Sequence, residues 1–165
     1  MRIIGLDPGL CNTGWGVIDV RGSNLKHVAN GTVKTNSNDP AHRRLKHIFD
    51  SLITIISEHK PDEAAVEETF MNNNPRSAIK LGEARGIALL TPAHLNIPVF
   101  EYAANKIKKA VVGVGHADKV QIQAMMNILF PGCPLASPDS ADALAIAVCH
   151  ANHRETNNVW LAREK

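Results

Sequence analysis

The stretch that most constrains the fold is Ile3-Ile4-Gly5-Leu6-Asp7-Pro8-Gly9, a short apolar run that ends in an acidic residue and a turn. An apolar run bounded by turn-forming residues is typical of a buried strand, so Asp7 is predicted where a core strand reaches the surface. A carboxylate at such a position is costly without a partner. Asp7 is therefore either a turn residue that hydrogen-bonds the following amides or a ligand for a cation, and this stretch alone does not choose.

Length and composition are those of a single globular domain. The 165 residues are 44% hydrophobic and 21% charged, which is enough to bury one sizeable core. The formal net charge of +2 indicates no nucleic-acid-binding surface unless basic residues cluster locally. Cys11, Cys133 and Cys149 lack the paired spacing of a zinc site and indicate no disulfide framework. Without a signal peptide or an apolar run of about 20 residues, a cytoplasmic protein with no membrane segment is expected.

Turn-forming residues divide the next part of the chain into two further strands. Residues 13–20 alternate small or polar side chains with apolar ones and are expected to return antiparallel to the first strand. Gly22 and Asn24 then turn the chain into a third strand over residues 25–35. The chain therefore opens with a predicted three-strand antiparallel meander.

A helix and a fourth strand follow the meander. Asp39-Pro40 is expected to supply an N-cap and a first-turn proline, and Lys60-Pro61 to end the helix. The strand over residues 62–67 then belongs beside the first strand, because a strand, a crossover helix and a strand form a parallel unit. Neighbouring strands lie ~4.8 Å apart, so Asp7 and Glu67 are expected to face each other at the carboxyl edge of the sheet. A bound cation is the simplest remedy for their repulsion.

The remaining chain supplies helices and one more strand. Helices are predicted over residues 74–91, 102–112, 118–130 and from 139 or 140 onward, and a strand over residues 97–101. The fold class is therefore α/β, with a five-stranded mixed sheet of three antiparallel and two parallel strands flanked by helices. One domain is expected over residues 1–150, with a short polar tail over residues 151–165. Ala78, Gly82 and Gly86 recur at four-residue intervals and allow another helix to approach closely, within the fold or in a second subunit.

Two more acids, Asp139 and Asp142, lie three residues apart at the start of the last helix and share one face. Asp139 as N-cap and Asp142 at the third helical position also resemble a capping pair. The two roles are compatible, because a capped helix end presents ligands rigidly. With Asp7 and Glu67 the set supplies four oxygen donors, which favour Mg²⁺ or Mn²⁺ over zinc. Two such ions ~3.5–4 Å apart are typical of phosphodiester hydrolysis, so the set indicates a nuclease or polymerase-like site.

A series of short motifs runs in one order from residue 3 to about residue 150. They are Gly5-Leu6-Asp7-Pro8-Gly9, Thr13-Gly14-Trp15-Gly16-Val17, Val66-Glu67-Glu68-Thr69-Phe70, Leu81-Gly82-Glu83-Ala84-Arg85-Gly86, Phe100-Glu101-Tyr102-Ala103-Ala104, Val111-Val112-Gly113-Val114-Gly115 and Asp139-Ser140-Ala141-Asp142-Ala143-Leu144-Ala145-Ile146-Ala147. Together they resemble RuvC, the family of bacterial Holliday-junction resolvases.

The resemblance implies an RNase H-like fold, a homodimer, and paired symmetric cuts in four-way DNA junctions during recombination and repair. It also implies two Mg²⁺ ions in each active site, for which Mn²⁺ can substitute, and association with the branch-migration motor complex of RuvA and RuvB. It maps the catalytic, metal-binding acids onto Asp7, Glu67, Asp139 and Asp142. Asp7 would bridge both ions and Glu67 and Asp142 would complete their coordination. Asp139 would hold an ion or orient the attacking water.

Candidate DNA contacts lie outside the acids. Phe70 is either a core residue or, as the resemblance implies, a residue that stacks on an unpaired base, a contact worth ~1–3 kcal/mol. Lys108 and Lys119 correspond to family lysines near the DNA, although a lysine is most often solvated surface. Further candidates for phosphate contacts are Arg76, Lys80, Lys106 and Lys109.

Two other functions match parts of the sequence. An actin- or sugar-kinase-like phosphotransferase uses a similar acidic turn and Thr-Gly hairpin, but it needs two such lobes. A non-catalytic junction-binding module would keep the fold without cutting, although the presence of all four acids argues against it. His150 and His153, three residues apart, are expected on an exposed helix face rather than as a metal pair.

Overall fold

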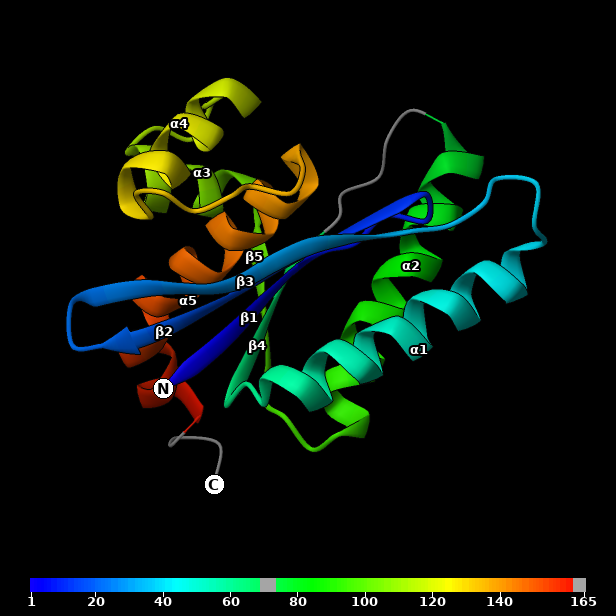
Figure 1. Ribbon diagram of the computed structural model, residues 1–165, viewed down its shortest axis with the longest axis horizontal. Coiled ribbons are helices and arrows are strands. Elements are labelled where there is room, and N and C mark those ends of the chain that lie inside the picture. The colour runs from blue at the N-terminus through cyan, green and yellow to red at the C-terminus, as the bar shows by residue number, and fades with distance from the viewer. Residues whose placement is uncertain (69–73, 162–165) are drawn as a thin grey trace.

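The computed structural model of the chain describes residues 1–68 and 74–161, and for residues 155–161 it describes the helical backbone alone. Its elements, labelled in Figure 1, are β1 (Arg2–Asp7), β2 (Asn12–Arg21), β3 (Asn24–Lys34), α1 (Ala41–His59), β4 (Glu63–Glu68), α2 (Pro75–His94), β5 (Val99–Ala103), α3 (Ala104–Val112), α4 (Lys119–Leu129) and α5 (Pro138–Leu161). Residues 151–161 continue α5, where the sequence predicted a polar tail.

The five strands form one mixed sheet in the order β3-β2-β1-β4-β5. β1, β2 and β3 pair antiparallel as the predicted meander, whereas β4 pairs parallel with β1 and β5 pairs parallel with β4. Leu6 of β1 lies opposite Val66 of β4 in the register. The predicted fold class and the parallel pairing of the first and fourth strands are therefore confirmed.

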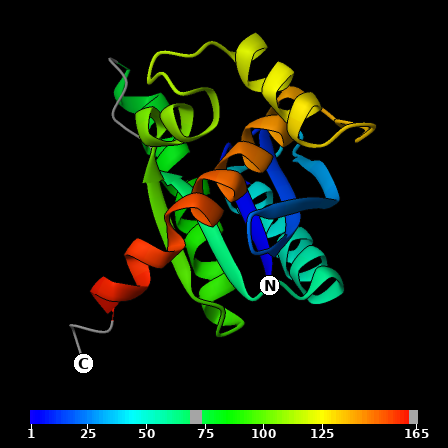
Figure 2. The ribbon, with the colours of Figure 1, turned by 90° about the vertical axis from the view of Figure 1, so that its left-hand side faces the viewer.

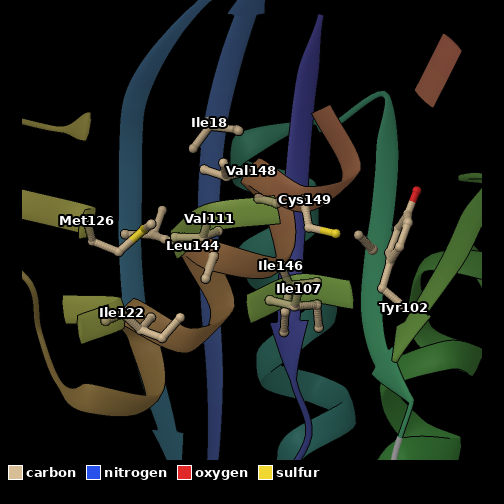
Figure 3. Close-up of a cluster of buried hydrophobic side chains, with 14 of the residues drawn as sticks. Ile18, Tyr102, Ile107, Val111, Ile122, Met126, Leu144, Ile146, Val148 and Cys149 are labelled. Carbon is tan, nitrogen blue, oxygen red and sulfur yellow. The ribbon is translucent and has the colours of Figure 1, made fainter. Parts of the chain in front are cut away.

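The sheet separates two helical layers, which Figure 1 shows on either side of the strands. α1 and α2 cover one face, where Ile4 and Leu6 are buried. α5, with α3 and α4 beyond it, covers the other face, where Ile3 and Ala65 are buried. Figure 3 shows this second core, and Figure 2 shows α5 running across the sheet from its start beside α4. Neighbouring strand residues point to opposite faces, so a near-continuous apolar strand such as β1 serves both cores.

α5 lies unusually close to β1 and β2 because glycines face it. A Cβ atom on Gly5 would come 2.1 Å from the carbonyl oxygen of Ala143, and one on Gly14 would come 2.1 Å from that of Asp139. Both distances are far below van der Waals contact. The first turns of α5 therefore pack main chain against main chain on the sheet.

Several predicted helix ends need correction. Asp39 is not the N-cap of α1; the Pro40 carbonyl accepts from the Arg43 and Arg44 amides, so the helix begins one residue later, and Pro40 has no side-chain acceptor to form a cap bond. Pro92 lies inside α2 rather than beyond it, within its last turn. The predicted end of α1 is confirmed, since Lys60 adopts the left-handed conformation with φ 48°.

No helix within residues 1–68 and 74–161 combines the length and apolar character needed to cross a membrane.

Candidate active site

Asp7 and Glu67 stand at the carboxyl ends of neighbouring parallel strands. Asp7 is the last residue of β1 and Glu67 the penultimate residue of β4, each directly after the registered pair of Leu6 and Val66. Burial raises the pKa of Asp7 to about 8, with further contributions from the charges of Glu67, Asp142 and Asp139. Burial also raises the pKa of Glu67, which a hydrogen bond from the Asp7 carboxyl partly offsets. The structure thus brings together the two acids that the strand pattern predicted.

The start of α5 brings the other two acids to the same edge. α5 begins at Pro138, one residue earlier than predicted, and Asp139 lies in its first turn. Asp139 is not the N-cap, because a reciprocal pair of serines caps the helix: the Ser140 amide donates to Ser137 Oγ and the Ser137 amide to Ser140 Oγ, both at 3.0 Å. The carboxyl groups of Asp139 and Asp142 are therefore not needed for capping.

The acids border a cavity of about 480 Å³ between the sheet edge and helices α3, α4 and α5. Asp7, Glu67 and Asp142 line this cavity, and so do Lys108 of α3 and Lys119 at the start of α4. Lys119 Nζ lies 3.5 Å from Asp142 Oδ2, with its side chain 70% exposed. The cavity therefore combines a buried acidic floor with a basic rim.

The lysines change how readily the acids ionise. Burial raises the pKa of Asp142, and the ammonium group of Lys119 opposes that rise. The charges of Lys108 and Lys119 likewise lower the pKa of Glu67. Asp139 is half-buried and does not line the cavity, although its charge raises the pKa values of both Asp7 and Asp142. The four acids thus affect one another electrostatically, and each of the other three raises the pKa of Asp7.

The other predicted contact residues do not reach the cavity. Arg76 and Lys80 are exposed on α2, which covers the opposite face of the sheet. Lys106 lies over the ring of Tyr102, with its ammonium 5.0 Å from the ring centre. Phe70 falls outside the described residues.

The donor set fits a hard divalent cation. Within the described residues no three His, Cys, Asp or Glu side chains already stand together as a metal-binding cluster. Asp7, Glu67 and Asp142 nevertheless line one cavity, and their pKa values are raised by burial and mutual repulsion. A cation among them would remove that repulsion, and carboxylate oxygens are ligands that Mg²⁺ and Mn²⁺ accept.

Asp118 also lines the cavity, although the sequence motifs did not indicate it as a site residue. It caps α4 by accepting from the Gln121 amide at 2.8 Å, while the Gln121 side chain accepts from the Asp118 amide. The sequence carried the signal in the spacing of Asp118 and Gln121, which is that of a capping box. Asp118 thereby fixes where α4 begins and where the adjacent Lys119 stands.

The prediction for His150 is wrong. His150 is fully buried rather than exposed, and its Nδ1 lies 2.7 Å from the Tyr102 hydroxyl and its Nε2 2.8 Å from Glu63. Burial lowers the pKa of His150. The neutral ring then donates from Nε2 to the Glu63 carboxylate and accepts at Nδ1 from Tyr102. The apolar run of residues 143–149, which surrounds the helix on every side, was the signal that this part of α5 is enclosed.

Comparison with known proteins identifies relatives along almost the whole chain. The family model described as crossover junction endodeoxyribonuclease RuvC matches residues 3–150. A crossover junction endodeoxyribonuclease RuvC from Paramagnetospirillum magneticum is 53% identical over 156 residues, covering 94% of this chain and 94% of the relative. The protein of that name from Agrobacterium fabrum is 54% identical over 154 residues, covering 93% and 91%.

Solved structures give the same result. T. thermophilus RuvC in complex with a Holliday junction substrate superposes with a TM-score of 0.87 at 31% identity, covering 95% of this chain and 96% of that one. A yeast mitochondrial Holliday junction resolvase superposes with a TM-score of 0.64 at 12% identity, covering 93% of this chain and 78% of the other, and shares the fold.

Proposed function

This chain belongs to the RuvC family of crossover junction endodeoxyribonucleases, and from that membership we propose that it resolves four-way DNA junctions at the cavity bordered by Asp7, Glu67 and Asp142. Enzymes of this family hydrolyse DNA with the help of divalent metal ions. The observation that carries the assignment of the site is the half-buried Asp7 carboxyl at the end of β1, whose pKa is raised by the charges of three other acids.

The four acids are proposed to hold two Mg²⁺ ions. Asp7 would contact both, since it is coupled to Glu67, Asp139 and Asp142. Bound Mg²⁺ supplies an activated water and neutralises charge on the scissile phosphate. Mn²⁺ should substitute, because it accepts the same oxygen ligands.

The rim lysines act on the substrate and on the acids. Lys108 and Lys119 are proposed to contact DNA phosphates, which positions the strand without reading its sequence. Lys119 also favours the charged form of Asp142, because it opposes the rise in the pKa of that carboxyl, and the charged form is the one that can bind a cation. Arg76 and Lys80 remain candidates for more distant phosphate contacts, and Phe70 for stacking on a base at the crossover.

A homodimer is proposed because a junction offers two equivalent strands. On α2, Gly82 and Gly86 have nothing within 4 Å of an added Cβ, and Ile79 and Leu90 are 63% and 55% exposed. These residues recur at a spacing that places them along one side of the helix, which a second copy could cover. Association with RuvA and RuvB is proposed from family membership alone. The same holds for the proposal that residues 1–150 make up the nuclease domain.

The test is cleavage of a synthetic four-way junction with and without Mg²⁺. The unaltered protein should cut two opposed strands only when the metal is present, and Asp7→Asn should bind the junction but not cut it. Asp50→Asn, which alters an exposed acid on α1, is the matched control and should cut normally. Cutting by Asp7→Asn would refute the assignment of the site, and binding without cutting by the unaltered protein would favour a non-catalytic junction-binding module.

A further inference from the structure

Three residues in register form a row across the sheet at the level of the active site. Asp7 of β1 lies opposite Gly14 of β2, and Gly14 lies opposite Thr32 of β3. Directly opposed residues of antiparallel strands point to the same face of the sheet. The Gly14 position faces the Asp139 carbonyl, so all three positions of the row face the start of α5.

The outer end of the row is bonded to the cap of α5. The Thr32 hydroxyl lies 2.5 Å from Ser137 Oγ. Ser137 in turn exchanges two hydrogen bonds with Ser140, which is fully buried, and the Ser140 hydroxyl also donates to the Ser137 carbonyl at 2.8 Å. The hydroxyl of an edge strand is thus connected through one serine to the first turn of the helix that carries Asp139 and Asp142.

Asn30 reinforces the same connection two residues earlier on the same face of β3. Its Nδ2 donates to the Pro134 carbonyl at 3.1 Å, and its Oδ1 accepts from the Ala136 amide at 2.9 Å. Both contacts fall on the segment that joins α4 to α5. The side chain therefore ties that segment to the sheet just before the helix begins.

We propose that Thr32 and Asn30 are positioning residues for cleavage, which hold the start of α5 in register with Asp7 so that Asp139 and Asp142 can share a cation with it. The inference rests on the proposed function of the four acids. Neither residue lines the cavity within the described part of the chain, so each acts through α5 rather than on the substrate. A fixed helix start is needed because the acids repel one another and would otherwise move apart before a cation binds.

The first variant is Thr32→Val, which keeps the shape of the side chain and removes the hydroxyl, with Thr32→Ser as the variant that restores it. Thr54→Val is the matched control, because the Thr54 hydroxyl donates to the Asp50 carbonyl of its own helix at 3.0 Å and, among the described residues, bonds to no other segment. Four quantities are measured: the thermal midpoint without metal, junction affinity without metal, Mn²⁺ affinity by calorimetry without DNA, and the Mg²⁺ concentration that gives half-maximal cleavage.

Thr32→Val should weaken Mn²⁺ binding roughly 10-fold and raise the half-maximal Mg²⁺ concentration by a similar factor, as loss of an outer-shell partner typically does. Junction affinity without metal should change less than about twofold, because phosphate contacts are untouched. Thr32→Ser should recover most of the Mn²⁺ affinity, and Thr54→Val should behave as the unaltered protein. Asn30→Asp, which loses the donor to Pro134 and keeps the acceptor for Ala136, should act in the same direction as Thr32→Val.

Unchanged Mn²⁺ binding in both Thr32→Val and Asn30→Asp would overturn the proposal. It would also be overturned if Thr32→Ser failed as badly as Thr32→Val, or if cleavage fell only in proportion to the thermal midpoint. A failure of the proposed function can be told apart from a failure of this proposal. It would appear as normal cleavage by Asp7→Asn, whatever the two β3 variants do.

Discussion

Asp7 and Glu67, sixty positions apart in the chain, form a carboxyl pair in which Asp7 holds the proton at neutral pH. The pKa of Asp7 is raised to about 8, and its carboxyl donates a hydrogen bond that lowers the pKa of Glu67. Binding of a cation must therefore displace a proton, and this exchange leads to the first two predictions.

Asp7→Asn should stabilise the metal-free protein while abolishing cleavage. The folded-state pKa of about 8 lies above the ordinary value of 3.8, so Asp7 costs stability increasingly as pH rises through that window. At pH 8 with a chelator, the variant should be more stable by about 2 kcal/mol, or roughly 4–8 °C in thermal midpoint. Calorimetry at pH 5 and pH 8 measures this, with Asp50→Asn as the control. A lower midpoint for Asp7→Asn at pH 8 would contradict the prediction.

The metal requirement should fall as pH rises. Below about pH 8 a cation competes with the proton on Asp7, and above it the competition ends. The Mg²⁺ concentration for half-maximal cleavage should therefore decrease from pH 6.5 to pH 8.5 and then level off. Cleavage rates over a grid of pH and Mg²⁺ measure it, and the junction affinity without metal serves as the control. A requirement that does not vary with pH would show that Asp7 is already ionised before the metal binds.

Lys119→Met should weaken junction binding and shift the pH dependence of cleavage upward. Loss of one phosphate contact should reduce the salt dependence of binding by about one unit of slope. Loss of the ammonium next to Asp142 lets the pKa of that carboxyl rise further, so a higher pH is needed to ionise it. Lys26→Met is the matched control, since Lys26 is exposed on β3 opposite Asp19, at the end of the sheet away from Asp7. Equal effects of the two variants would exclude a specific role for Lys119.

His150→Phe should cost stability at neutral pH and flatten the loss of stability in acid. Removing the ring takes away the hydrogen bonds that it shares with Tyr102 and Glu63, which costs about 1–3 kcal/mol. Because burial lowers the folded-state pKa of His150 below 6.5, the unfolded chain takes up the proton first as pH falls, and stability present above pH 6.5 is lost below it. Urea unfolding from pH 8 to pH 5 tests both parts.

Two groups bear on the interpretation of that profile. His27, whose pKa is also lowered by burial, stays in the variant, so the slope should decrease rather than vanish. The charge of Arg154, whose Nε lies 3.6 Å from Glu63 Oε2, also lowers the pKa of His150. His47→Gln, at an exposed position of α1, is the control and should keep the slope of the unaltered protein. An unchanged acid slope in His150→Phe would refute the neutral buried state of that ring.

Gly82→Leu should weaken self-association without harming the fold. A Cβ atom at the exposed Gly82 meets nothing within 4 Å among the described residues, and leucine is a better helix former than glycine by about 1 kcal/mol. Sedimentation should show monomers of the variant at concentrations where the unaltered protein is dimeric. The thermal midpoint of the variant should be no lower than that of the unaltered protein diluted until it is monomeric. Ala124→Leu, on the exposed side of α4, is the control. Undiminished association would place the dimer contact on another surface.

Local patterns in the sequence predicted the sheet and the two strand-end acids. The apolar runs before Asp7 and Glu67 are short, end in turn signals and sit on either side of an amphipathic helix, and these features determine a parallel pairing. The end of α1 at Lys60-Pro61 was predicted for the same reason, because its signal is local. Such features need no knowledge of distant parts of the chain.

The misassigned residues depend on contacts between distant segments. Asp139 fits an N-cap by sequence, but Ser137 takes that role through its bonds with Ser140, and Thr32, more than a hundred positions away, bonds to the same Ser137 hydroxyl. His150 looks like an exposed polar residue until Tyr102 and Glu63 are brought to it by β5 and β4. A period or a motif in one segment does not reveal a partner supplied by another.

Glycines on β1 and β2 let the first turns of α5 lie directly on the main chain of the sheet, since no side chain at Gly5 or Gly14 stands between them. The distance from the sheet edge to the acids of α5 therefore does not depend on how neighbouring apolar side chains pack. The core can exchange one aliphatic residue for another over evolutionary time while the depth of the catalytic centre stays constant. A single methyl group at either glycine would change that depth at once.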